Sequence, residues 1–101
     1  MSILAVEIPF SVASAARVDS ESLTVDLADG RTIAVPLAWF PRVANGSPAE
    51  RSNWRKIGVG EGLHWPDLDE DIEIAGLLAG FRSGETQESL ARWLQSRRKS
   101  I

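Results

Sequence analysis

Residues 22–37 constrain the fold of this chain more than any other part of the sequence. Apolar residues occupy alternate positions on both sides of an Asp29-Gly30 dipeptide. Alternation places one set of side chains on one face of a strand, and glycine supplies the positive φ that a tight turn requires. We therefore predict a β-hairpin whose second strand ends near Pro36, because proline has no amide hydrogen to donate. The alternating apolar residues are Leu23, Val25, Leu27, Ile33, Val35 and Leu37.

The segments before the hairpin predict less regular structure. Residues 1–11 predict an N-terminal arm or an edge strand, since Pro9 disfavours a central strand. Residues 11–16 are small and polar, which predicts a connection leading into a strand that contains Arg17-Val18. The next residues, 19–22, predict a turn, because Asp and Ser side chains bond to nearby backbone amides.

Two helices are predicted after the hairpin. Ser47, Pro48 and Glu50 have the spacing of a capping box with proline at the first helical position. We expect this helix to run to about Lys56 and to stop before the glycines that follow. A narrow apolar stripe within residues 85–98 predicts the C-terminal helix.

Shorter elements complete a mixed pattern of strands and helices. A chain of 101 residues fits one domain, residues 1–101, and its 44% apolar content is ordinary for a packed core. The expected fold class is α+β, with a small antiparallel sheet and a central β-hairpin packed against two or three short helices. The shorter elements are a bend at 38–43, a Gly-rich loop at 58–62, strands at 63–65 and 72–74, and a helical turn at 75–80.

Composition narrows the classes of function. The chain has no cysteine, which excludes disulfides and zinc sites built on thiolates. Its first residues carry no basic leader, and no apolar stretch approaches the roughly 20 residues of a membrane span. We therefore expect a cytoplasmic protein with no membrane partner. The net charge of -3 disfavours general nucleic-acid binding, which requires Lys and Arg to neutralise phosphates.

The charges of the second half of the chain are sorted. Residues 51–101 hold eight acidic and eight basic side chains, and five of the acids lie in the block Asp67–Glu73. We interpret this acidic block either as a docking surface for a basic partner or as a solvated turn and strand face. Asp67, Asp69 and Asp71 match the first ligand positions of a calcium loop. The Gly and Glu that such a loop needs later are missing, so no metal site is expected.

The single histidine and the tryptophans are further candidate site residues. His64 is a candidate general base for a hydrolase-type enzyme. No nucleophile stands beside it in a diagnostic motif, so we expect neither catalysis nor a cofactor. Trp39 with Arg42, and Trp65 beside Pro66, are candidate interface anchors, because Trp and Arg are enriched in binding hot spots. The alternative for each tryptophan is burial in the core of a small domain.

Four stretches together form a longer pattern: Asp29 to Ile33, Pro36 to Arg42, Glu50-Arg51 with Trp54, and Gly60 to Ile72. In these stretches the chain resembles a bacterial family known as domain of unknown function 2442 (DUF2442). The resemblance spans roughly residues 12–98 and implies a small α+β domain with a short antiparallel sheet packed against helices. It implies no established activity and no catalytic residues. Members of the family resemble partner halves of small bacterial gene pairs suspected of being toxin–antitoxin modules.

The expected function is therefore partner binding. We expect a small non-catalytic protein-binding module, the antitoxin-like partner of a small basic protein in a bacterial gene pair. A structural or regulatory homo-oligomer formed through the N-terminal arm is the alternative. An operator-DNA contact through the basic residues 92–99 also stays open. The candidate partner-binding residues are Trp39, Arg42, His64, Trp65, Asp67, Asp69 and Asp71.

Overall fold

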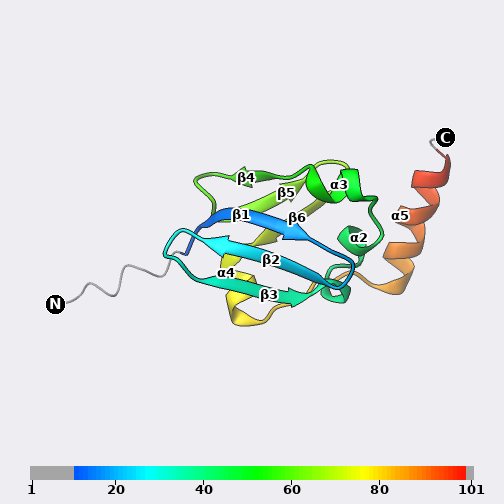
Figure 1. The fold of residues 1–101 in the computed structure, drawn as a ribbon. Coiled ribbons are helices and arrows are strands. Elements are labelled where there is room, and N and C mark those ends of the chain that lie inside the picture. Colours follow the sequence, from blue (N-terminus) through cyan, green and yellow to red (C-terminus); the bar gives the residue numbers. More distant parts are fainter. Residues whose placement is uncertain (1–10, 100–101) are drawn as a thin grey trace.

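The computed structural model describes residues 11–99, and these form two small antiparallel sheets that lie one in front of the other (Figure 1). The predicted hairpin forms the centre and one edge of the first sheet. Its strands are β2 (Ser22–Leu27) and β3 (Thr32–Pro36), which pair antiparallel. Gly30 has a φ of 98° in the turn, and β3 ends at Pro36, so both predictions are confirmed.

The other edge of the first sheet is β1 (Ala13–Val18), which pairs antiparallel with β2. The prediction that residues 11–16 form a connection or a short lead into a strand is wrong from Ala13 onward, where the strand itself begins. Alanine occupies three of the six positions of β1, so the apolar alternation is weak. An irregularity in register between Ala13 and Ala15 breaks the alternation further. The predicted turn at Asp19 is confirmed, because its Oδ1 accepts two backbone hydrogen bonds of 2.7 Å from the residues that follow.

The second sheet has the order β4 (Arg55–Ile57), β5 (Gly62–Trp65) and β6 (Glu70–Glu73). The strands predicted at 63–65 and 72–74 correspond to β5 and β6. The prediction of a helix to about Lys56 is wrong beyond Ser52. The chain does not continue the helix after Ser52. It forms β4, whose backbone pairs with β5.

Short helices join and flank the sheets. The predicted capping box is confirmed: Ser47 Oγ accepts from the Glu50 amide at 3.1 Å, and Glu50 Oε1 accepts from the Ser47 amide at 2.8 Å. The segment predicted as a strand exit or bend is a 3₁₀ turn followed by one helical turn. The elements are η1 (Leu37–Trp39), α2 (Pro41–Ala44), α3 (Pro48–Ser52), α4 (Ile74–Ala79) and α5 (Gln87–Lys99).

One apolar core lies between the two sheets and confirms the α+β fold class. Leu23 and Val25 of the first sheet and Leu63 and Trp65 of the second sheet are fully buried. No residue of α5 belongs to the buried core, and α5 lies at one end of the molecule beside α2 and α3 (Figure 1). No helix within residues 11–99 is long and apolar enough to cross a bilayer. The arm was predicted for residues 1–11, of which residues 1–10 lie outside the described residues.

Candidate docking surface

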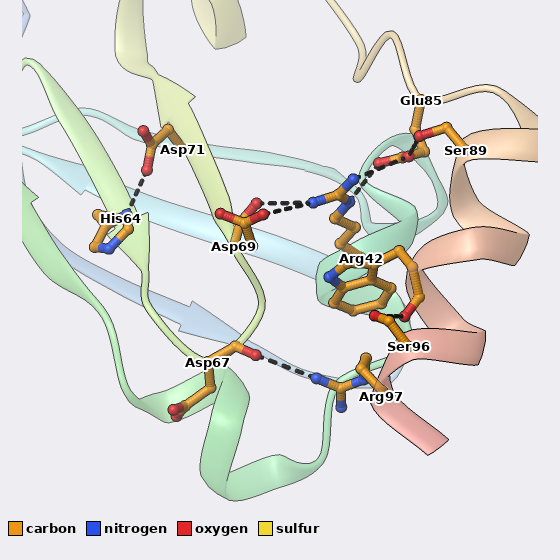
Figure 2. Close-up of polar contacts among 10 residues, drawn as sticks. Arg42, His64, Asp67, Asp69, Asp71, Glu85, Ser89, Ser96 and Arg97 are labelled. Atoms are coloured by element: carbon orange, nitrogen blue, oxygen red, sulfur yellow. Dashed lines mark hydrogen bonds and ion pairs between the residues drawn. The ribbon is translucent and has the colours of Figure 1, made fainter. Parts of the chain in front are cut away.

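The acidic block forms the turn between β5 and β6 and continues along β6 (Figure 2). Leu68 is fully buried and anchors the turn in the core. Asp69 follows it with a φ of 52°, in the left-handed region that Asp tolerates better than most residues. Ile72 is buried farther along, in β6. The block is therefore a strand end whose apolar members face inward and whose carboxylates mostly face solvent.

Glu70 is the exception among these carboxylates. It lies opposite Trp65 in the β5–β6 register, and cross-strand neighbours share a face of the sheet. Its side chain therefore lies on the same face as the buried Trp65 and Ile72. Burial raises the pKa of Glu70 to about 7, reinforced by the negative charges of Glu85, Asp71 and Asp69, while Arg42 acts in the opposite direction.

His64 lies on the outer face of the same sheet. Its Nδ1 contacts Oδ1 of Asp71, the residue opposite it on β6 (Figure 2). A carboxylate thus holds the imidazole ring. Within residues 11–99, the imidazole has no hydroxyl or other nucleophile as a hydrogen-bond partner. This contact fixes the orientation of the imidazole ring.

The side chain of Arg42 is held by contacts within the fold. Its guanidinium bonds to Glu85 at 2.6 and 3.3 Å and to the side chain and carbonyl of Asp69 at 3.1 and 3.2 Å (Figure 2). It also lies 5.2 Å from the centroid of the Trp93 ring. The hydrogen bonds from Arg42 and Ser89 lower the pKa of Glu85. Arg42 thus ties the acidic turn to α5.

The structure corrects the assignment of Trp65 as an interface anchor. Its side chain is fully buried, and Nε1 donates to the carbonyl of Arg51 at 2.9 Å. A buried indole with a satisfied N–H has no surface to offer a partner. Trp39 is half-buried, and the guanidinium of Arg82 lies 4.7 Å from its ring centroid. Of the two tryptophan anchors predicted, only Trp39 keeps some exposed surface.

Part of the basic segment 92–99 makes contacts with the rest of the domain. Arg97 donates to the carbonyl of Asp67 at 3.1 Å and to Glu50 at 2.8 Å, and its guanidinium lies 4.6 Å from the Trp93 ring centroid. It therefore fastens α5 to α3 and to the acidic turn. Asp67 also accepts a hydrogen bond of 2.9 Å from Asn53. These contacts make Asp67 and Arg97 parts of the scaffold.

A pocket that the sequence did not reveal opens beside β6. Its volume is about 420 Å³, and it lies between β6, α4 and the segment 80–84. Glu70 lines it, and Phe81, which is 68% exposed, lies at its rim. The period of two running back from Ile72 could have placed Glu70 on the inner face. No sequence signal marked Phe81, because its exposure depends on how α4 ends.

Within residues 11–99, no group of three or more His, Asp or Glu side chains is arranged to hold a metal ion. The carboxylates of the acidic block point to different faces of β6 and its turn.

Two short antiparallel sheets around one core, flanked by short helices, define a small α+β protein with an acidic strand edge. The chain belongs to the family described as protein of unknown function (DUF2442), whose pattern matches residues 13–83. A crystal structure of a protein of unknown function from Rhodospirillum rubrum ATCC 11170 is similar, with a TM-score of 0.63. It is 34% identical over 77% of this chain and 94% of that chain. No curated protein matches the chain.

Proposed function

We propose that this protein is a non-catalytic binding module that docks a small basic protein on its acidic face. The acidic face consists of Glu70, Asp71, Glu73 and Phe81, which line the pocket beside β6. In its finer form, the proposal is an antitoxin-like role in a bacterial gene pair. The proposal concerns an intracellular complex with another protein, with no cofactor.

The observation that carries this proposal is an exposed aromatic side chain beside two carboxylates, Glu70 and Glu73, that form no ion pair within residues 11–99. Phe81 is 68% exposed, which is unusual for a large apolar residue of a small domain. Glu70 and Glu73 have no hydrogen bond or ion pair through their side chains in residues 11–99. Aromatic anchors flanked by uncompensated charge are typical of protein interfaces, where charge steers the encounter and the aromatic residue supplies affinity.

The experiment starts with the tagged protein purified from its native host at moderate salt, followed by measurement of the complex mass. We expect a small basic protein at a fixed ratio. The double variant Asp71→Lys/Glu73→Lys should weaken that complex at least tenfold, a loss of about 1.4 kcal/mol or more. It leaves intact Asp67 and Asp69, which hold Asn53 and Arg42.

The matched control is Glu21→Lys/Glu61→Lys, which makes the same charge change at two exposed carboxylates outside the acidic face. This variant should bind like the natural protein. An equal loss of partner binding in both variants would show that the effect depends only on net charge. A homo-oligomer with nothing bound would favour the alternative through the N-terminal arm, which remains a prediction for residues 1–10. The enzyme alternative through His64 predicts an activity that His64→Ala abolishes with the fold intact.

A further inference from the structure

The pocket beside β6 has walls that the fold holds in place. The amide of Gly80 donates to Leu77 at 3.0 Å and that of Phe81 donates to Gly76 at 2.9 Å, which is the bonding of a helix C-cap. Farther along, the amide of Ser83 donates to the carbonyl of Trp39 at 3.0 Å. The exposed Phe81 side chain is therefore carried by a fixed backbone, which lowers the entropic cost of binding against it.

The interior of the pocket combines apolar walls with one carboxyl group. Phe40, Leu77 and Phe81 line it together with Glu70. The Glu70 side chain has no hydrogen bond or ion pair within residues 11–99. Arg82 also lines the pocket, and its guanidinium lies over the Trp39 ring. The pocket thus presents a half-buried acceptor that no side chain of the described chain satisfies.

We propose that this pocket accepts one lysine side chain of the basic protein partner, with the ammonium on Glu70 and the methylene stem against Phe81. This inference rests on the proposed function and names the contact that makes the partner recognisable. A lysine stem is apolar and its head is a compact charge, which matches an apolar-walled pocket with a single carboxyl. β6 is an edge strand, so the partner's backbone can approach the pocket from the open side of the sheet.

Binding of a cation at Glu70 depends on the ionised carboxyl. The charged groups facing Glu70 are Arg42 from α2, Glu85 from the segment before α5, and Asp69 and Asp71 on either side of it. Glu73 and Arg82 also line the pocket. Because the pKa of Glu70 is raised to about 7, the carboxyl is mostly neutral at pH 5.5 and mostly ionised at pH 8. We expect lysine binding to weaken about 30-fold between pH 8 and pH 5.5, in proportion to the ionised fraction of the carboxyl.

The probe is the capped peptide Ala-Ala-Lys-Ala-Ala, titrated into the isotope-labelled full chain and followed by amide chemical shifts. Shifts should move at residues 70–73, 76–77 and 81–84. The same peptide with acetylated lysine should leave them unchanged. Glu70→Gln should abolish both the binding and its pH dependence, whereas Glu73→Gln should preserve both. Shifts elsewhere, or binding that Glu70→Gln does not change, would overturn the proposal.

The native complex separates this inference from the proposed function. If a basic partner purifies with the chain but binds Glu70→Gln and the natural protein equally at pH 8, the docking function stands and the lysine pocket is wrong. If the peptide binds as expected but no protein partner is found, the pocket stands as a lysine site and the docking function is wrong. Loss of the partner with Glu70→Gln alone, and not with Glu73→Gln, supports both.

Discussion

At the scale of single residues, Glu70 differs most from what its type predicts. In the sequence it is one of five acids in a block, whereas the cross-strand register with Trp65 shows that it faces inward. A pattern of charge cannot show this, because the face of a strand residue depends on where the strand begins. By contrast, the inward positions of Leu68 and Ile72 follow from their apolar character. Sequence therefore predicted the acidic surface but not the pocket within it.

The first prediction concerns the cost of ionising Glu70. Its pKa is raised to about 7 in the folded protein, from 4.5 when unperturbed. The folded state therefore holds a proton that the unfolded state releases, and stability falls as pH rises from about 4.5 to 7. Glu70→Gln should be more stable than the natural protein at pH 8, by roughly 1 kcal/mol after allowing for partial solvent contact. The advantage should vanish near pH 4.

Urea unfolding at pH 4, 6 and 8 measures this difference. The matched control is Glu73→Gln, which neutralises a neighbouring exposed carboxylate on the same strand and should change stability little at any of the three pH values. A Glu70→Gln variant that is less stable than the natural protein at pH 8 would contradict the prediction. It would mean that the carboxylate makes a favourable contact in the folded state.

The second prediction concerns Gly60, in the connection between β4 and β5. Its φ is +117°, and a Cβ built on it would lie 2.6 Å from the Ala13 carbonyl oxygen. That carbonyl belongs to β1, and the Ala13 amide donates to Gly60 at 2.8 Å, so the two sheets meet at this point. Gly60→Ala should therefore lower stability by about 2–3 kcal/mol through strain and displaced backbone.

Thermal unfolding followed by circular dichroism checks the Gly60 prediction. Gly84→Ala is the matched control, because a Cβ at Gly84 meets nothing within 4 Å and its φ is not in the left-handed region. This control should leave the midpoint nearly unchanged. Equal midpoints for the two variants would show that the connection adjusts without strain.

At the scale of elements, the sequence predicted those that carry their own local signals. The hairpin with Asp29-Gly30 and the capping box at Ser47 were confirmed because turn and cap chemistry act within a few residues. The first residues of β1 and the whole of β4 were missed for a different reason. Each is an edge strand with little alternation, and β4 has only exposed residues, so its strand form depends on pairing with β5. Elements defined by distant partners leave no local pattern.

The third prediction concerns the attachment of α5. Arg42 is 18% exposed at its side chain and Glu85 6%, so their ion pair is shielded from water. Arg42→Met keeps most of the volume but leaves the Glu85 carboxylate with Ser89 as its remaining partner. We expect the free energy of unfolding to fall by about 2 kcal/mol. Hydrogen exchange should accelerate more in α5 than in β2.

Hydrogen exchange by mass spectrometry resolves α5 from the sheets. Arg82→Met is the matched control, because Arg82 also lies over a tryptophan, Trp39, but makes no ion pair in the described residues. It should leave exchange in α5 unchanged. Uniformly faster exchange throughout the chain in Arg42→Met would contradict the prediction, since it would place Arg42 in the global core.

At the scale of the whole molecule, the chain is a two-sheet core with an attached helix. Every buried residue of the core lies between Ala13 and Leu77, and the family pattern covers residues 13–83. From α5, Trp93 packs against this core only as a partly buried side chain. The sequence predicted both the α+β class and the last helix, but a single narrow apolar stripe could not show that α5 is peripheral.

The fourth prediction follows from this division. A chain that ends after Gly84 should still unfold cooperatively, because it keeps every buried core residue. Its free energy of unfolding should fall by about 2 kcal/mol, because the truncation exposes the surface under Trp93 and removes the partner of Arg42. Its thermal midpoint should fall by about 10 °C.

Arg42→Met should then cost little stability in the shortened chain, because the Glu85 contact is already gone. The difference between its cost in the full and shortened chains measures the coupling of Arg42 to α5. A shortened chain without a cooperative transition would place α5 in the folding core, and an undiminished cost of Arg42→Met would assign the role of Arg42 to the acidic turn alone.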